Sequence, residues 1–298
     1  MSSLLLGLKY SVEARPAGLA LGGPEPAVSG AFPGSQRTLA FGVRGDVTPC
    51  CHARHIGMGE HRSVLLIGAT GLVGSECLRL LLENDAFSRV VVLSRRPLSG
   101  ASSHPKLKTH LVDFDRLTSA ASWFAVDQII CALGTTMKAA GSRARFRAVD
   151  LLYPLTAAHL GVEKRVSHFL LVSALGANPG SRFFYNRMKG ELEYAVAELP
   201  YRSLTIARPS LLVGKRERPR LGERVVGGLR ALFPARYRPI HATDVARVLI
   251  QHAVADAAGR RIIESMELRA MAMNGASHDV APAASPATID GAPQSSLV

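Results

Sequence analysis

Short runs of apolar residues alternate along the middle of the chain with longer stretches in which apolar residues recur at helical spacing. The apolar runs predict strands at residues 63–67, 90–93, 110–112, 128–133, 168–172 and 203–207. The amphipathic stretches predict helices that begin near Leu72, Arg145, Tyr185 and Asp244. Strands that are apolar throughout and alternate with helices are typical of a parallel sheet covered on both faces. The pattern therefore predicts an α/β fold with a doubly wound parallel sheet.

The two ends of the chain lack this pattern. Residues 1–62 hold ten glycines and five prolines without a sustained period, and residues 266–298 are rich in Ala, Pro and Ser. Such segments bury too little apolar surface to repay the entropy of ordering them. We expect both ends to be disordered and residues 63–265 to form a single domain, with 208–265 as a small substrate-side region. An organelle transit peptide within 1–62 is the alternative.

Length and composition narrow the class of protein. The 298 residues suffice for one α/β domain with tails, and 47% apolar and 20% charged residues fit a globular core. No apolar run approaches the ~18 residues that a membrane span needs. The four cysteines are irregularly spaced, which argues against a disulfide scaffold, and no metal site is expected. A cytoplasmic location is therefore expected.

The formal charge of +13 lies in the middle of the chain, because residues 1–62 carry a net +2 and residues 266–298 a net −2. A basic domain attracts phosphates of any kind. Eight Lys and Arg residues lie between Lys215 and Arg238. We interpret that segment as a solvated basic face, and nucleic acid is not an expected partner because aromatic residues are not interleaved with the cations.

A glycine-rich segment, Gly68-Ala-Thr-Gly71-Leu-Val-Gly74, follows the first predicted strand and begins the first predicted helix. Its first glycine permits a tight turn, its second lets the backbone approach a pyrophosphate, and its third lets helix and strand pack closely. The amides and dipole of the helix N-terminus then face the anion. This segment predicts a dinucleotide site, with contacts from Gly68, Thr70, Gly71, Leu72, Val73 and Gly74.

Residues after the later strands bear on which dinucleotide binds. NAD-selective sites place an acid at the end of the second strand, whereas this chain has Arg95 and Arg96 there. Guanidinium groups can pair with a 2′-phosphate that a carboxylate would repel, so NADP is the expected cofactor and NAD the alternative. Contacts are also predicted from Asp113, Leu133 and Gly134. For Asp113 a helix cap is the competing role.

A second group of residues predicts proton transfer. Ser173 follows the strand at 168–172, and Tyr185 and Lys189 stand four residues apart, on one face of a predicted helix. The ammonium, helped by a bound nicotinamide, would lower the phenol pKa from its usual value near ~10, so that Tyr185 could exchange a proton near neutral pH. Ser173 would hold the oxygen of the substrate.

Residues 63–265, about two thirds of the chain, resemble an atypical short-chain dehydrogenase/reductase of the Tat-interacting protein-like branch, within the wider NAD-dependent epimerase/dehydratase group. The segments that carry the resemblance are Gly68-Ala-Thr-Gly71-Leu-Val-Gly74, Phe146-Arg-Ala-Val-Asp150, Val172-Ser-Ala-Leu-Gly176, Tyr185-Asn-Arg-Met-Lys189, Glu191-Leu-Glu193, Ala207-Arg-Pro209 and Ile240-His-Ala-Thr-Asp244-Val-Ala. The resemblance implies a Rossmann-type fold, bound NAD(P), and Ser173, Tyr185 and Lys189 as catalytic residues. Lys189 would also bond the nicotinamide ribose.

Two features depart from the wider superfamily. Many of its members place an Asn on the helix after the fourth strand, where it orders a water for proton relay. This chain has Val149 and Asp150 there, so the sequence does not predict that relay. Epimerases and dehydratases also use a larger C-terminal region for a nucleotide sugar, whereas only residues 208–265 remain for that purpose here.

The favoured function is an NAD(P)H-dependent oxidoreductase that transfers hydride to or from a small carbonyl or alcohol substrate. One alternative is a non-catalytic NADPH-sensing regulatory or scaffold protein, and another is an enzyme similar to sugar-nucleotide epimerases. The presence of Ser173, Tyr185 and Lys189 together favours the enzyme, because a sensor gains little from all three. The sequence predicts neither the substrate nor the oligomeric state.

Overall fold

The computed structural model describes residues 61–98, 103–214 and 234–276. Outside these ranges lie almost all of the expected N-terminal extension, most of the basic segment that ends at Arg238, and the expected tail beyond residue 276. Within the described part of the chain, no helix has the length and apolar character needed to cross a membrane.

The main sheet has seven parallel strands in the order β3-β2-β1-β4-β5-β6-β9. The strands are β1 (Arg62–Ile67), β2 (Phe87–Ser94), β3 (Leu107–Leu111), β4 (Gln128–Cys131), β5 (His168–Val172), β6 (Ser203–Arg208) and β9 (Gly259–Glu264). The shorter strands β7 (Leu212–Val213) and β8 (Ile240–His241) pair with each other. The strand order reverses between β1 and β4, as in other Rossmann-type sheets, and ligands of such folds bind beyond the carboxyl ends of the strands at this switch point.

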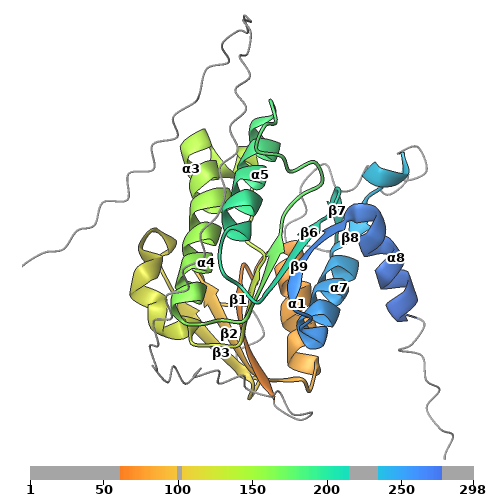
Figure 1. Cartoon of the computed structure of the whole chain (residues 1–298). Coiled ribbons are helices and arrows are strands. Elements are labelled where there is room, and N and C mark those ends of the chain that lie inside the picture. Colours follow the sequence, from red (N-terminus) through yellow and green to blue (C-terminus); the bar gives the residue numbers. More distant parts are fainter. Residues whose placement is uncertain (1–60, 99–102, 215–233, 277–298) are drawn as a thin grey trace, which may run out of the picture. The chain divides into compact units, whose positions relative to one another are not determined.

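Helices cover both faces of the sheet (Figure 1). One face packs against α1 (Leu72–Glu83), α7 (Ala242–Ala255) and α8 (Ser265–Ala276). The other packs against η1 (Phe114–Phe124), α4 (Tyr153–Glu163) and α5 (Phe184–Ala197). The remaining helical segments are α2 (Met137–Ala140), α3 (Arg143–Arg147), η2 (Ala148–Leu152) and η4 (Ala235–Tyr237). This arrangement confirms the predicted doubly wound α/β fold.

Strand β1 shows why its sequence is apolar throughout. Val64 and Leu66 pack into the core on the side of α1 and α7, whereas Leu65 and Ile67 pack into the core on the side of α4 and α5. All four side chains are fully buried. Because alternate residues of a strand point to opposite faces, a strand at the centre of a covered sheet needs apolar residues at every position.

Several predicted boundaries are corrected by the structure. The third strand lies at Leu107–Leu111 rather than at 110–112, and the helix expected from Arg145 is divided among α3, η2 and α4. Strand β9 and helix α8 were not predicted, and α8 extends to Ala276, into the segment expected to be a disordered tail. Helix α8 is ordered by packing, since Leu268 and Ala272, one turn apart, are buried in the core.

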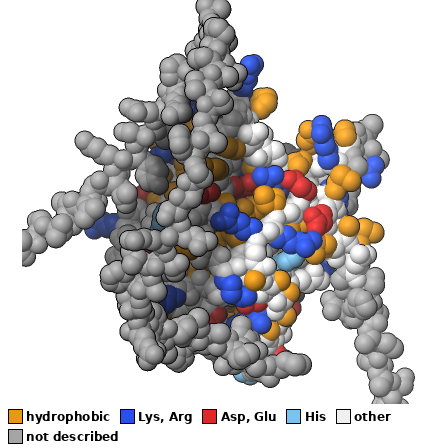
Figure 2. All heavy atoms as spheres, viewed as in Figure 1, with side chains coloured by type: hydrophobic (Ala, Val, Ile, Leu, Met, Phe, Trp, Pro, Cys, Tyr) orange, Lys and Arg blue, Asp and Glu red, His pale blue; other side chains and the backbone are white. Residues whose placement is uncertain are grey.

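Basic side chains on the face drawn in Figure 2 lie beside acidic ones at several points. Arg208 contacts Glu264 at 2.8 Å, and Arg261 contacts Glu267 at 2.6 Å. The positive charge of the domain is therefore partly paired on its surface. An exposed pair such as Arg261 with Glu267 contributes only about 0 to 1 kcal/mol to stability.

Candidate functional site

The loop between β1 and α1 is built from close backbone contacts that exclude side chains. Gly68 has a φ of +91°, and a Cβ there would lie 2.6 Å from the carbonyl oxygen of Ala132. A Cβ on Gly74 would lie 2.1 Å from the carbonyl oxygen of Gly68. The amide of Gly71 donates to Gly68 O at 2.9 Å, which closes the turn. Glycine is therefore required at Gly68 and Gly74 by geometry.

Helix α1 begins directly after this turn, and no side chain caps it at Gly71. An N-terminus without a capping side chain leaves its amide groups available to an anion, and the helix dipole favours negative charge there. The side chain of Thr70 is exposed beside the turn. The loop fits the pyrophosphate of a dinucleotide in the manner that the sequence predicts.

Ser173 follows β5 at the carboxyl edge of the sheet. Its amide donates to Ala207 O at 2.8 Å, which fixes the backbone against β6. The residue is only 5% exposed, and its Oγ is buried without a hydrogen-bond partner among the described residues. A buried hydroxyl without a partner is costly in a folded protein, and a ligand that bonded Ser173 would remove that cost.

Tyr185 and Lys189 lie one turn apart near the start of α5. The ring of Tyr185 packs edge-on against Phe146 at a centroid distance of 5.7 Å, and 38% of the residue is exposed. Lys189 is buried at 2% exposure. The next residue, Gly190, contacts the backbone of the preceding loop, since a Cβ there would lie 2.2 Å from Pro179 N. Close packing of helix and loop thus sets the position of both side chains.

Asp150 is the partner of Lys189, and its role as a site residue was missed by sequence reasoning. It lies fully buried on η2, a π-helical segment, and its Oδ1 is 2.9 Å from the Nζ of Lys189. Its Oδ2 accepts a hydrogen bond of 2.8 Å from the amide of Thr135. Short π-helical segments are frequent at functional sites. An acidic residue between Val149 and Leu151 in an apolar helical stretch was the available signal.

Burial and neighbouring charges shift the pKa values of Lys189 and Tyr185. Burial disfavours the ammonium of Lys189, but the charge of and hydrogen bond to Asp150, together with the effects of Tyr185 and Cys131, outweigh burial, and the pKa of Lys189 is raised above its usual value. Burial also raises the pKa of the Tyr185 phenol, which Lys189 acts to lower and Asp150 acts to raise. In the free protein the phenol pKa is thus shifted upward, and the lower pKa predicted with a bound nicotinamide stays a prediction.

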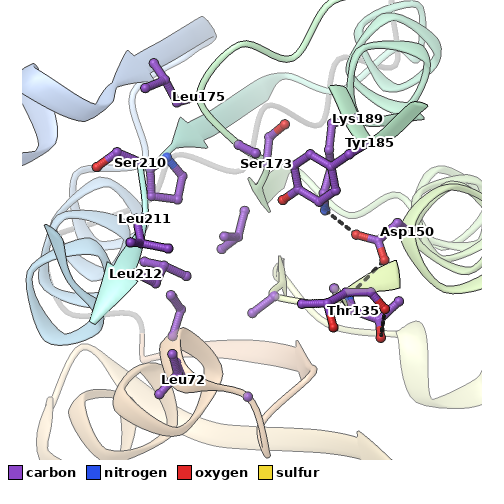
Figure 3. Close-up of a pocket in the computed structure, with 18 of the residues that line it drawn as sticks. Leu72, Thr135, Asp150, Ser173, Leu175, Tyr185, Lys189, Ser210, Leu211 and Leu212 are labelled. Carbon is purple, nitrogen blue, oxygen red and sulfur yellow. Dashed lines mark hydrogen bonds and ion pairs between the residues drawn. The ribbon is translucent and has the colours of Figure 1, made fainter. Parts of the chain in front are cut away.

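These residues line one cavity of 820 Å³ at the carboxyl edge of the sheet (Figure 3). Of the predicted site residues, those that line it are Gly71, Leu72, Val73, Leu133, Gly134, Ser173, Tyr185 and Lys189. Gly68 and Thr70 belong to the adjoining loop and Gly74 to the first turn of α1, and none of the three lines the cavity. The lining residues that were not predicted as contacts include Thr135, Asp150, Leu175, Pro209, Ser210, Leu211, Leu212, Pro234 and Tyr237.

The residues expected to select the cofactor lie outside this cavity. Arg95 and Arg96 are exposed in the turn after β2, where the hydroxyl of Ser94 donates to Arg96 O at 2.7 Å. Asp113 caps η1, because its Oδ1 accepts from the amide of Asp115 at 3.0 Å. The alternative role of Asp113 as a helix cap is therefore present in the structure. The predicted contact of Asp113 with the cofactor stays a prediction.

Comparison with known proteins shows the family of this chain. The family model for the semialdehyde dehydrogenase NAD-binding domain matches residues 63–145. The protein HTATIP2 of Rattus norvegicus is 31% identical over 218 residues, which are 71% of this chain and 88% of that protein. The mitochondrial protein fmp52 of Emericella nidulans is 38% identical over 168 residues, or 55% of this chain and 72% of that protein. The chain belongs to the HTATIP2/FMP52 family. This family assignment confirms the resemblance to NAD(P)-binding proteins of the short-chain dehydrogenase/reductase type.

Solved structures with the same fold are more distant. The Bordetella bronchiseptica enzyme WbmH in complex with NAD⁺ matches with a TM-score of 0.56 and 15% identity, over 75% of this chain and 84% of that one. MoeE5 in complex with UDP-glucose and NAD matches with a TM-score of 0.54 and 18% identity, over 72% and 82% of the two chains. At such identities the likeness supports the Rossmann-type fold of this HTATIP2/FMP52 family member and nothing finer.

The expected cytoplasmic location is wrong in the light of these comparisons. Several fungal relatives in the HTATIP2/FMP52 family, among them those of Emericella nidulans and Aspergillus fumigatus, carry the designation mitochondrial in their names. This finding points to mitochondria and away from the cytoplasmic location expected from the sequence. The expectation rested on the scarcity of cysteines and the lack of a long apolar run, and both properties are also compatible with a mitochondrial protein.

Proposed function

We propose that this protein is an NADP-dependent oxidoreductase that interconverts a carbonyl and an alcohol. The observation that supports this most strongly is the convergence of Ser173, Tyr185 and Lys189 on one cavity that begins at the N-terminus of α1. A hydroxyl without a partner, a phenol and an ammonium are the groups that bind and protonate a carbonyl oxygen. A dinucleotide with its pyrophosphate at α1 would extend into the same cavity.

Ser173, Tyr185 and Lys189 each have a distinct role in the proposed reaction. Ser173 Oγ donates to the substrate oxygen and orients it, and Tyr185 Oη exchanges a proton with that oxygen. Lys189 remains an ammonium, because Asp150 stabilises its charge, and its remaining N–H groups are donors for the nicotinamide ribose. In the reducing direction, NADPH supplies a hydride to the carbonyl carbon while Tyr185 supplies the proton to the oxygen, so that NADP⁺ and an alcohol result.

The choice of NADP rests on the turn after β2. Two adjacent exposed guanidinium groups, Arg95 and Arg96, stand where NAD-selective sites place an acid. Each can form charge-assisted bonds to the three oxygens of a 2′-phosphate. The proposal is therefore specific for NADP, whereas the family itself implies only a nicotinamide dinucleotide.

The cavity also favours a small uncharged substrate. Its wall opposite Tyr185 is apolar and includes Leu72, Leu211 and Leu212 (Figure 3). Among the described lining residues, the charged side chains are Asp150 and Lys189, which pair with each other. The positive charge of Lys189 is therefore not available to bind the phosphates of a nucleotide sugar. The epimerase alternative is disfavoured for this reason and because of the short C-terminal region.

The experiment that tests this function has two steps. Native mass spectrometry of the purified full chain with NADPH and with NADH establishes whether a dinucleotide binds and which one binds more tightly. Oxidation of NADPH is then followed with a panel of uncharged aldehydes and ketones. Turnover of at least one carbonyl supports the oxidoreductase. Tight NADP binding without turnover of any of them would favour the sensor instead.

A further inference from the structure

Strand β9 is an edge strand whose outer side has no partner in the described part of the chain. It pairs with β6, and its first four residues, Gly259 to Ile262, are exposed. In Figure 1 it lies beside α8 at one edge of the sheet. The outward backbone groups of an exposed edge strand can pair with another strand. The kind of strand that fits depends on which residues of β9 face outward.

The outward backbone groups belong to every second residue of β9. The amide of Gly259 donates to the carbonyl of Arg202, the residue before β6, at 2.8 Å, so the backbone groups of Gly259 face β6. These groups alternate in direction from one residue to the next along a paired strand. The amide and carbonyl groups of Arg260, Ile262 and Glu264 therefore point away from β6.

The side chains of these three residues share one face of β9, because side chains also alternate along a strand. Ile262 is an apolar side chain with 47% of the residue exposed. Arg260 is exposed and has no ion pair with a described residue. Arg260 and Glu264 are about 13 Å apart along the strand at ~3.3 Å per residue, so they are too far apart to pair within one chain.

The negative charge at Glu264 is not fully balanced by the described residues around it. Arg208 contacts Glu264 at 2.8 Å, but it also bonds Glu193 at 3.1 Å. One cation thus serves two carboxylates, and this cluster of described residues carries a net negative charge. The side chain of Glu264 is about half exposed, so a cation from outside the chain can reach it.

We propose that β9 pairs with β9 of a second copy of the chain, antiparallel and centred on Ile262, so that the two sheets join into one. A two-fold axis at Ile262 sets Arg260 opposite the second copy's Glu264, and the reverse, which gives two ion pairs. The two Ile262 side chains lie opposite each other and cover their exposed apolar surface. The outward amides and carbonyls of all three residues become donors and acceptors of an antiparallel ladder.

The charges on the edge favour this register. A two-fold axis at Arg260 or at Glu264 would set like charges opposite each other, whereas an axis at Ile262 brings opposite charges together. Charged side chains can also protect an edge from pairing. Arg261 does not have that effect here, because it points to the other face and is paired with Glu267 at 2.6 Å.

Sedimentation velocity of the full chain over roughly a hundredfold range of concentration tests this pairing. The wild-type mass should approach that of two chains as the concentration rises. Arg260→Glu and Glu264→Arg should each weaken self-association at least roughly tenfold, because both attractive contacts become repulsive. An equal mixture of the two variants should restore the dimer, since opposite charges then face each other at both ends of the ladder in a mixed pair.

A backbone variant tests the ladder independently of charge. Ile262→Pro removes an outward N–H and keeps the bonds to β6, and an edge strand tolerates proline where its N–H faces away from the sheet. It should abolish the dimer and leave the fold intact. Lys108→Glu is the matched control, because Lys108 is an exposed cation on β3, the edge strand at the other side of the sheet, and its replacement should leave the dimer unchanged.

Circular dichroism establishes that each variant is folded. Should Glu264→Arg not fold, Arg260→Glu and Ile262→Pro decide the matter. A wild-type chain that stays monomeric over the whole range, or a dimer that survives both of these variants, would overturn the proposal. So would a mixture of folded Arg260→Glu and Glu264→Arg chains that stays monomeric, because Arg260 would then not face Glu264. The measurement needs neither cofactor nor substrate, so its failure would leave the proposed function standing.

Discussion

At the scale of single residues, the cavity combines an ion pair with a hydroxyl that has no partner in the described chain. Asp150 Oδ1 lies 2.9 Å from Lys189 Nζ, whereas the Oγ of Ser173 is buried without a hydrogen-bond partner in the described structure. Burial of such a hydroxyl costs free energy. Ser203 Oγ is also buried without a partner in the described structure, but Ser173 lines the cavity and Ser203 does not, so we expect a ligand to bond Ser173.

Replacement of that hydroxyl should separate stability from activity. Ser173→Ala removes an unsatisfied polar group, so the free energy of unfolding should change by no more than about 0.5 kcal/mol, while turnover falls at least roughly tenfold through loss of one hydrogen bond to the substrate. Denaturant titration and NADPH oxidation measure the two effects. Ser203, at the amino end of β6, is also buried with an unpartnered Oγ within the described ranges, so Ser203→Ala is a matched control that should retain full turnover. A large loss of stability in Ser173→Ala would assign the hydroxyl a structural role.

The two arginines after β2 allow a second test at this scale. Arg95→Asp combined with Arg96→Ala should weaken NADPH binding far more than NADH binding, since each lost charge-assisted contact is worth roughly 1.5 to 3 kcal/mol. Calorimetric titration with both cofactors gives the ratio. Arg260→Asp with Arg261→Ala changes an equally exposed pair on β9, at the other edge of the sheet, and should affect neither cofactor. Equal losses for NADPH and NADH in the first variant would place Arg95 and Arg96 away from the 2′-phosphate.

At the scale of elements, an ion cluster holds α5 against the sheet. Arg208, the last residue of β6, bonds the buried Glu193 of α5 at 3.1 Å and Glu264 of β9 at 2.8 Å. Hydrogen bonding to Glu193 raises the pKa of Arg208 above its usual value, with a smaller effect from Glu264. Glu193 stands one turn beyond Lys189 on the same helix, so the cluster contributes to the placement of the part of α5 that carries Tyr185 and Lys189.

Removal of this cation should therefore be costly. Arg208→Met keeps much of the side-chain volume but leaves Glu193 buried without its partner, so the free energy of unfolding should fall by roughly 3 kcal/mol. Arg79→Met is the control, because Arg79 contacts Glu83 at 2.7 Å on the exposed side of α1 and its loss should cost less than about 1 kcal/mol. Denaturant unfolding measures both. Equal losses in the two variants would show that the Arg208 cluster contributes no more than a surface pair.

The elements that were predictable are those whose pattern is local. Strand β1 has an apolar side chain at each of its last four positions because both of its faces are covered, and the glycine spacing of Gly68 and Gly74 follows from close contacts within one turn. Strand β9 was missed because it lies at the sheet edge, where Arg260 and Arg261 are exposed and break the apolar run. The partnership of Asp150 with Lys189 joins residues far apart in the sequence, and no local pattern reports such a contact.

At the scale of the whole molecule, the folded part ends later than the sequence indicates. Helix α8 packs on α7, and Leu268 is fully buried while Met273 of the same helix is 73% exposed. The segment was interpreted as a tail because residues 266–298 are rich in Ala, Pro and Ser. Helix α8, which ends at Ala276, packs against the core on the side of α1 and α7.

Two truncated chains test this boundary. A chain that ends at residue 265 loses Leu268 from the core and should have a free energy of unfolding lower by at least roughly 2 kcal/mol than a chain that ends at residue 276. Denaturant unfolding of residues 1–265 and 1–276 gives the difference. Leu268→Ala should reproduce much of the loss, and Met273→Ala should not. Equal stability of the two chains would mean that α8 adds nothing to the core.

The measurement that tests the oxidoreductase most directly is turnover of the full chain after Tyr185→Phe. This change removes the proton-transferring oxygen and keeps the ring that packs against Phe146. Turnover of a carbonyl with NADPH should fall by at least ~10², while NADPH affinity and melting temperature stay nearly unchanged. Tyr194→Phe, at an exposed tyrosine of the same helix, should retain wild-type turnover. Wild-type turnover in Tyr185→Phe would contradict the account, because the proton would then come from another group.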